Sequence, residues 1–330
     1  MPITTAEQLM GMTSAFQAPC VIGAAAELDV FTKIGAKALT AYEIANKLRA
    51  DLRGTTALLD ALVALEVLIK EGDKYRVPPE ILKLLTEKNR ENMLSMARHQ
   101  MNCLRGWAEL AKVVKKGVPA KRRASIRGAK RDRAAFLEAM DNISAPAAPV
   151  LVGKLLPLSF KHLLDVGGAS GTWTAAFLNA VPDSKATLFD LPDAIPHAEK
   201  RLSALGLKDR VTLVAGDFYM DTLPAGADLV WLGAIIHQNS RQQNRELFAK
   251  CFAACSSGGR ILIRDIVMEP GKTAPKGGAM FAINMLVHTP HGGTFTLAEM
   301  DEDLRAAGFG PARQIVFDPW MNSVVEAVKP

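Results

Sequence analysis

Three glycines behind an apolar run form the first group of residues whose types and spacing could do chemistry. The run LLDV, which holds Asp165, leads into Gly167, Gly168 and Gly171, and the segment TWTAAFLNAV follows with helical periodicity. This order predicts a buried strand, a glycine-rich turn and a helix, an arrangement in which a ligand reaches the backbone of the turn and the helix N-terminus.

Asp190 completes this signal. It ends the apolar run KATLFD, 19 residues after Gly171, near the spacing at which a carboxylate binds the ribose hydroxyls of a nucleoside. A dinucleotide fingerprint, G-x-G-x-x-G, would place its first glycine at Val166, so that fingerprint is absent. The pattern present is D-x-G-x-A-x-G with Ala169 at the small middle position. We therefore predict a cofactor that contains adenosine but is not a dinucleotide.

His237 is the candidate for acid–base chemistry. It follows the apolar run WLGAII, so we expect it at the end of a strand, in the cleft above the sheet. A neutral phenol, with a pKa of about 10, is a poor nucleophile at neutral pH, whereas an imidazole, with a pKa of about 6.5, can accept the proton as the new bond forms.

Composition bounds the class of protein. The 330 residues are 49% hydrophobic and 22% charged, which indicates an ordinary globular chain of two domains. We expect a cytoplasmic protein without a membrane span, because there is no long apolar run and MPITTAEQLM does not read as a signal. Four cysteines argue against a disulfide scaffold, and Cys251 and Cys255 lack a second Cys or His pair, so no metal is expected.

The net charge of +6 is concentrated in residues 112–133, which hold ten Lys or Arg and one acidic residue. Such a patch could attract nucleic acid, but it contains no interleaved aromatic residues. We interpret it as a charged connecting segment, and nucleic-acid binding is the less favoured reading.

The N-terminal part predicts a winged helix. After a largely apolar helical stretch at 6–35, LTAYEIANKL and RGTTALLDALVALEVL read as two helices, and LIKEGDKYRV reads as a hairpin. A winged helix that reads DNA uses its second helix, but TTALLDALVALEVL carries no Lys or Arg. An apolar helix surface is better suited to packing against a partner chain, so dimerisation is the favoured role.

The C-terminal part supplies the rest of an α/β, doubly wound, Rossmann-like sheet. Apolar runs at 210–218, 227–237 and 259–267 predict strands separated by helices. The runs ARQIVFD and SVVEAV are separated only by PWMN, so we expect a closing antiparallel hairpin.

Six segments resemble, in the same order, the catalytic domain of the S-adenosylmethionine-dependent O-methyltransferases typified by plant caffeate and animal acetylserotonin enzymes: LLDVGGASG, FDLPD, AGDFY, IIHQNS, RDIVMEP and GGTFTLAEMDEDLRAAGF. The winged helix is similar to that family's dimerisation domain. The resemblance implies a dimerisation domain at 1–105, a basic helical connector at 106–135 and a catalytic domain at 136–330. It also implies a homodimer that uses S-adenosylmethionine, releases S-adenosylhomocysteine and needs no metal.

The resemblance implies cofactor contacts for Ser144, Asp165, Gly167, Gly168, Asp190, Leu191, Asp217 and Phe218. The glycine turn would meet the methionine and ribose portions, and Asp190 the ribose hydroxyls with Leu191 beside it. Asp217 would meet the adenine amino group and Phe218 the adenine ring. The segment FLEAMDNIS, which ends at Ser144, resembles the helix that covers the methionine end.

The resemblance also implies that His237 takes the proton from a substrate hydroxyl while Asp265 supports the histidine. Two departures weaken this implication: Gln238 and Asn239 follow the histidine in place of Asp and an aromatic residue, and Thr294 stands in place of a second supporting acid. Transfer to carbon or nitrogen, as in relatives that act on tetrapyrroles, therefore stays an alternative. So does a non-catalytic, cofactor-sensing regulator, whereas a dehydrogenase is disfavoured by Val166 and the closing hairpin.

The acceptor site is implied by the segment GAMFAINMLVHTP. Its residues Met280, Phe281, Met285 and His288 recur at helical spacing, and flexible Met side chains suit flat apolar molecules. We expect an aromatic or conjugated small molecule, and the sequence does not identify it.

Overall fold

The computed structural model describes residues 3–86 and 92–330. It divides the chain into two units, one formed by Met1–Ala108 with Lys121–Asn142 and the other by Glu109–Ala120 with Ile143–Pro330. The basic segment 112–133 contributes residues to both units.

The first unit has the predicted order of helices followed by a small wing. Its elements are α1 (Ala6–Ser14), α2 (Gln17–Glu27), α3 (Val30–Ile34), β1 (Leu39–Thr40), α4 (Ala41–Leu48), α5 (Leu52–Ala64), β2 (Ile69–Glu71), β3 (Lys74–Arg76), α6 (Pro79–Leu84) and α7 (Leu94–Trp107). Thr40 caps α4 through a reciprocal pair of hydrogen bonds with Glu43, which explains why the helix begins there. The three strands pair in the order β1-β3-β2.

The apolar N-terminal stretch 6–35 forms three helices, α1, α2 and α3. By length and composition alone, Ala6–Glu27 is apolar enough to cross a membrane, with a mean hydropathy of 1.3. No residue of α1 is buried, and Leu9, Met10, Met12 and Phe16 are all more than half exposed within the single chain. These side chains form an apolar surface that a partner could cover.

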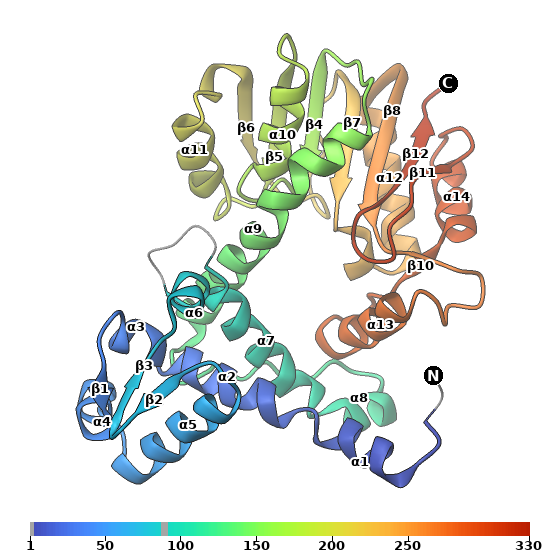
Figure 1. The fold of residues 1–330 in the computed structure, drawn as a ribbon. Helices are drawn as coiled ribbons and strands as arrows, with labels where there is room; N and C mark the ends of the chain where they lie inside the picture. The colour runs from blue at the N-terminus through green and yellow to red at the C-terminus, as the bar shows by residue number, and fades with distance from the viewer. Residues whose placement is uncertain (1–2, 87–91) are drawn as a thin grey trace. The chain divides into compact units, whose positions relative to one another are not determined.

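The second unit contains a seven-stranded sheet, β11-β12-β8-β7-β4-β5-β6, shown in Figure 1. Its strands are β4 (His162–Val166), β5 (Lys185–Asp190), β6 (Val211–Ala215), β7 (Ala227–Gly233), β8 (Cys255–Asp265), β11 (Arg313–Val316) and β12 (Ser323–Val328). The first five are parallel to one another, and β11 and β12 are antiparallel to their neighbours. The predicted doubly wound sheet with a closing hairpin is confirmed.

Helices cover both faces of this sheet. Residues of α12 (Arg241–Ala254) and α14 (Leu297–Ala306) pack on one face. Residues of α10 (Thr172–Ala180), α11 (Ile195–Ala204) and the end of α9 (Ala129–Lys154) pack on the other. The remaining elements of this unit are α8 (Leu110–Lys116), β9 (Val267–Met268), α13 (Lys276–His288), β10 (Phe295–Thr296) and two short 3-10 helices, η1 (Lys208–Arg210) and η2 (Ile236–Gln238).

The sheet order places a crevice between β4 and β7. From β4 the chain continues through β5 and β6 in one direction along the sheet, and then returns to β7 and β8 in the other. Ligands of open α/β sheets bind at such a switch point, outside the carboxyl ends of the strands. The turn after β4 carries the glycines, and the turn after β7 carries His237.

One local prediction is wrong. We expected the strand to continue to His237, but β7 ends at Gly233 and His237 lies in η2. Ala234 has a φ of 59°, which ends the extended backbone, and its N–H donates to the carbonyl of Arg264 at 2.7 Å. The histidine is therefore placed by a short turn and not by the strand itself.

Candidate active site

The glycine turn packs tightly on the sheet. Gly167 and Gly171 have φ of +72° and +75°, a region that favours glycine. A Cβ at Gly167 would lie 2.7 Å from Cδ1 of Ile235, and one at Gly168 would lie 2.6 Å from Cγ of Leu188. The turn therefore needs glycines for its own packing against Ile235 and Leu188.

Asp165 lies beneath this turn. Its side chain is 1% exposed, and Oδ2 accepts a hydrogen bond from the hydroxyl of Thr174 at 2.6 Å. Burial raises the pKa of this carboxyl to about 7, against the opposing effect of the Thr174 hydrogen bond. Asp165 thus joins β4 to α10, and its predicted contact with a cofactor stays a prediction.

Asp190 ends β5 beside the turn. Its oxygens accept the backbone N–H groups of Ala169 at 2.7 Å and Leu191 at 2.6 Å. Within the described residues no cation pairs with it, and burial raises its pKa. Each carboxylate oxygen can accept more than one hydrogen bond, so Asp190 retains acceptor capacity for neutral donors such as ribose hydroxyls.

Asp217 and Phe218 follow β6 at the same edge of the sheet. Asp190 and Ala215 are register partners in β5 and β6, so the residues just after each strand lie close together. Oδ1 of Asp217 accepts the backbone N–H of Tyr219 at 2.9 Å. Phe218 packs against the core, and a Cβ at Gly167 would lie 3.8 Å from its ring.

His237 and Asp265 form a hydrogen-bonded pair. Nδ1 of His237 lies 2.9 Å from Oδ2 and 3.1 Å from Oδ1 of Asp265, and the side chains are 13% and 2% exposed. An ionised carboxylate can only accept, so Nδ1 carries the proton and Nε2 of the neutral ring is left with the lone pair. Oδ1 of Asp265 also accepts the N–H of Ile266 at 2.8 Å, which fixes the carboxylate.

The backbone of η2 is held by the segment before β10. The N–H of Gly293 donates to the carbonyl of His237 at 2.9 Å. A Cβ at Gly292 would lie only 2.5 Å from that same carbonyl oxygen. Thr294, which stands where a second acid was expected, is 6% exposed, and within the described residues the hydrogen bonds to the His237 ring come from Asp265.

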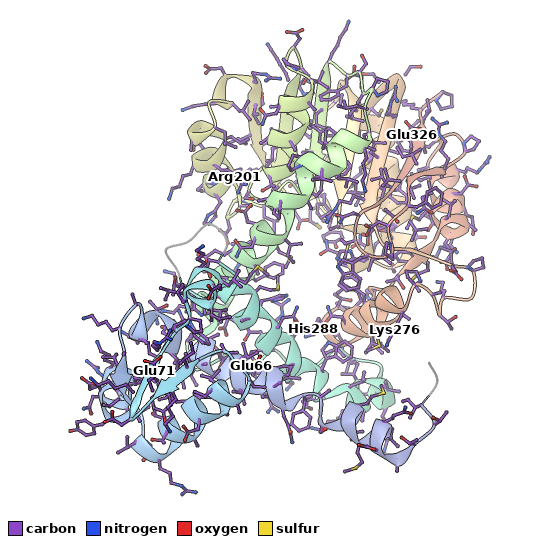
Figure 2. All side chains as sticks on the ribbon, in the orientation of Figure 1. Glu66, Glu71, Arg201, Lys276, His288 and Glu326 are labelled. Carbon is purple, nitrogen blue, oxygen red and sulfur yellow. The ribbon has the colours of Figure 1, made fainter. Side chains whose placement is uncertain are left out.

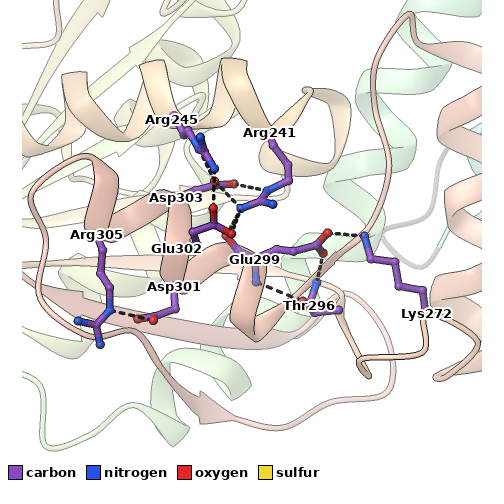
Figure 3. Close-up of polar contacts among 9 residues, drawn as sticks. All are labelled: Arg241, Arg245, Lys272, Thr296, Glu299, Asp301, Glu302, Asp303 and Arg305. Atoms are coloured by element: carbon purple, nitrogen blue, oxygen red, sulfur yellow. Dashed lines mark hydrogen bonds and ion pairs between the residues drawn. The ribbon is translucent and has the colours of Figure 1, made fainter.

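Ion pairs hold the surrounding elements together, as Figure 3 shows. Arg241 and Arg245, at the start of α12, both pair with Asp303 and Glu302 of α14. In the first turn of α14, Glu299 contacts Lys272 at 2.7 Å. Because α12 begins directly after η2 and α14 directly after β10, these pairs fix the two segments that hold the histidine backbone.

A buried amide chain also supports η2, and sequence reasoning did not find it. Asn239, which is 0% exposed, accepts the hydroxyl of Tyr219 at 2.5 Å and donates to Asn244 at 2.9 Å. Asn244 in turn donates to the carbonyl of Ile236 at 3.1 Å. This chain connects the residue after Phe218 with the turn that carries His237.

The predicted acceptor residues all lie on α13, whose two ends are labelled by Lys276 and His288 in Figure 2. Phe281 contacts the His237 ring edge to face, with centroids 4.9 Å apart. Met280 is 49% exposed and Met285 is buried. His288 uses Nδ1 on the carbonyl of Asn284 at 2.9 Å, and its buried Nε2 has no partner within the described part of the chain.

Ser144 is half-buried in α9, and its predicted contact with the methionine end stays a prediction. Among residues 3–86 and 92–330 the structure shows no group of three or more His, Cys, Asp or Glu side chains that could hold a metal.

Comparison with known proteins decides the family. A model described as the O-methyltransferase domain matches residues 107–310, and one described as the O-methyltransferase dimerisation domain matches residues 10–78. The chain belongs to the O-methyltransferase family. It is an S-adenosylmethionine-dependent methyltransferase, as its resemblance in sequence predicted.

Individual relatives agree along nearly the whole length of this methyltransferase. The 8-O-methyl transferase TcmO of tetracenomycin polyketide synthesis, from Streptomyces glaucescens, is 31% identical over 92% of this chain and 91% of its own. The 3-hydroxy-5-methyl-1-naphthoate 3-O-methyltransferase of Streptomyces sahachiroi is 30% identical over 93% and 90%. Human N-acetylserotonin methyltransferase, solved in complex with SAM, superposes with a TM-score of 0.81 at 25% identity over 99% and 98%.

The residues at the switch point fit S-adenosylmethionine. α10 begins at the glycine turn without a side-chain cap, and the N-terminus of a helix favours an anionic group such as a carboxylate. Asp190, one strand away, is a partly buried acceptor that pairs with no cation among residues 3–86 and 92–330. A nucleoside with an amino-acid tail offers ribose hydroxyls as donors to Asp190 and a carboxylate to the helix N-terminus.

Proposed function

We propose that this methyltransferase transfers the methyl group of S-adenosylmethionine to a hydroxyl oxygen of an aromatic or conjugated small molecule, with His237 as general base and Asp265 as its support. The observation that carries this proposal is the Nδ1–carboxylate pair of 2.9 Å between the ends of β7 and β8. With Nδ1 of His237 donating to the carboxylate of Asp265, Nε2 of the same ring can accept a proton.

The proposed mechanism divides the work between positioning and proton transfer. S-adenosylmethionine supplies, when bound, a sulfonium methyl group that is open to attack by oxygen. Nε2 of His237 accepts the hydroxyl proton as the oxygen gains its new bond, and Asp265 stabilises the imidazolium that results. The rigid turn at η2 holds the base in one place, and alignment of the reacting atoms supplies much of the rate enhancement.

The cofactor would be held by the residues at the ends of β4, β5 and β6. We assign the backbone of the glycine turn to the methionine and ribose portions, Asp190 and Leu191 to the ribose, and Asp217 and Phe218 to the adenine. Their common edge of the sheet supports this assignment.

Oxygen is the proposed target because the family model and two of the relatives are O-methyltransferases. Transfer to carbon or nitrogen is the second candidate. Other relatives are an N-methyltransferase and a C-methyltransferase. Because Asp265 is the one carboxylate assigned to support His237, with Thr294 in place of a second acid, the histidine is also suited to an acceptor more acidic than a simple phenol.

We further propose that the protein is a cytoplasmic homodimer. Its chain would consist of a dimerisation domain at 1–105, a basic helical connector at 106–135 and a catalytic domain at 136–330. The match of residues 10–78 to a dimerisation domain and the exposed apolar side chains of α1 support the dimer.

The test combines binding with turnover. Calorimetric titration should show micromolar binding of S-adenosylhomocysteine to the wild type and its loss in Asp190→Ala. With phenol, 2-naphthol and 1-hydroxyanthraquinone as trial acceptors, His237→Ala should lower kcat by about 100-fold or more and leave the S-adenosylhomocysteine affinity within about twofold, since no cofactor contact is assigned to His237. Unchanged turnover in His237→Ala would contradict the role of His237 as general base. Absence of S-adenosylhomocysteine binding to the wild type would contradict the assignment of the switch point as the cofactor site.

A further inference from the structure

An aromatic series extends outward from the proposed base. Phe281 lies between His237 and Trp320, with ring centroids 4.9 Å apart on one side and 5.8 Å apart on the other. Both contacts are edge to face, at 87° and 79°. The indole of Trp320 is 45% exposed, whereas Trp173 and Trp231 of the same unit are buried.

Trp320 is placed there by the loop between β11 and β12. Since β12 is antiparallel to β8, its first residue, Ser323, pairs with Asp265 at the end of β8. The loop therefore lies at the strand end that carries the support of His237. Within the loop, Oδ1 of Asp318 accepts the N–H groups of Trp320 at 2.9 Å and Asn322 at 3.2 Å.

Two further contacts make this loop a fixed platform. The buried guanidinium of Arg264 donates to Oδ1 of Asn322 at 2.9 Å and lies 4.5 Å from the ring centroid of Trp173 in α10. A Cβ at Gly277 would lie 2.7 Å from the Trp320 ring. The indole thus rests directly on the backbone of α13, one helical turn before Phe281.

We propose that Trp320 determines acceptor specificity: its exposed indole forms the outer wall of the acceptor site and contacts the distal ring of a flat, fused-ring aromatic acceptor. A single-ring acceptor with its hydroxyl at His237 would contact Phe281, whereas an acceptor with further fused rings reaches the indole. This assignment rests on the proposed function, because it requires the hydroxyl to lie at His237.

Two probes that differ by one fused ring test the assignment. Salicylate and 3-hydroxy-2-naphthoate carry the same neighbouring hydroxyl and carboxylate, so the difference between their affinities reports the added ring. Each is titrated calorimetrically into the enzyme saturated with S-adenosylhomocysteine. We expect Trp320→Ala to weaken naphthoate binding by about fivefold or more, and Trp320→Phe to weaken it less, since a smaller ring retains part of the contact. Salicylate and S-adenosylhomocysteine affinities should change by less than about twofold, because neither ligand reaches the indole in this assignment.

Phe317→Ala is the matched control. This residue lies on the same hairpin and is 77% exposed, and its loss should change none of the three affinities. The assignment is overturned if the naphthoate does not bind the wild-type complex, if Trp320→Ala binds it normally, or if both probes lose equally. Failure of S-adenosylhomocysteine to bind the wild type contradicts the proposed function instead, so the two failures are distinguishable.

Discussion

Two buried aspartates at strand ends do different work because their partners differ. Each accepts one backbone N–H, but the side-chain donor is the imidazole of His237 for Asp265 and the hydroxyl of Thr174 for Asp165. An imidazole becomes a cation when it takes up a proton, whereas a hydroxyl stays neutral. Asp265 is therefore suited to stabilise a developing imidazolium, and Asp165 carries the raised pKa of about 7.

The raised pKa of Asp165 predicts a pH-dependent stability. Burial, reinforced by the charge of Asp190, raises the folded pKa above the unfolded value of 3.8. Between these two values the folded protein binds more protons than the unfolded chain, so stability falls as the pH rises. Between pH 5 and pH 7, the free energy of unfolding of the wild type should fall by about 2–3 kcal/mol more than that of Asp165→Asn.

Urea unfolding without ligand, at several pH values, measures this difference. Asp183→Asn, at an exposed position, is the matched control and should follow the wild type. Parallel pH profiles of wild type and Asp165→Asn would contradict the account of Asp165.

At the scale of elements, the position of η2 depends on a close backbone contact. Gly292→Ala would place a Cβ 2.5 Å from the carbonyl oxygen of His237 and 2.4 Å from Oγ1 of Thr289, so the turn must move. Since small misplacements of catalytic groups are costly, kcat should fall by about tenfold or more. Affinity for S-adenosylhomocysteine should change little, because the glycine turn and Asp190 lie on other strands.

The neighbouring glycine supplies the control. A Cβ at Gly293 meets nothing within 4 Å, and alanine keeps the N–H that donates to His237. Gly293→Ala should therefore retain wild-type kcat. Equal losses in the two variants would show that the segment acts through flexibility rather than through the contact at Gly292.

The sequence predicts the elements whose signal is local. Apolar runs predicted the strands, the segment LTAYEIANKL predicted α4, and the segment LIKEGDKYRV predicted the hairpin of β2 and β3. The true end of β7 was not predictable, because Ala234 leaves the strand in a positive-φ conformation while its N–H pairs with Arg264 of a neighbouring strand.

The contacts that support the site were not predictable from the sequence either. The buried Asn239 accepts a hydrogen bond from Tyr219, 20 residues earlier in the chain, and Trp320 contacts Phe281 from the closing hairpin. Both contacts depend on how distant segments meet in space, and no periodicity or motif in the sequence reports that. The glycines and acids at the strand ends were found from the sequence, because apolar runs and spacing define those positions.

At the scale of the whole molecule, the exposed surface of α1 requires an explanation. Leu9, Met10, Met12 and Phe16 are 54%, 69%, 60% and 54% exposed, and leaving such side chains in water is unfavourable by about 25 cal/mol per Å² of apolar area that a partner could bury. Helix length and composition would also permit membrane insertion. The dimerisation-domain match favours a second copy of the chain as the partner.

Oligomeric state separates these two explanations. By light scattering after size-exclusion chromatography, the wild type should have twice the 35.6 kDa mass of the chain without detergent. Leu9→Asp with Phe16→Asp should shift it toward monomer at micromolar concentration, because two charges would have to be buried in the interface. Leu205→Asp, at a 50% exposed leucine of the second unit, should remain dimeric. A wild type that is monomeric, or that requires detergent to stay in solution, would contradict a dimer built on α1 and would favour the membrane explanation of this apolar surface.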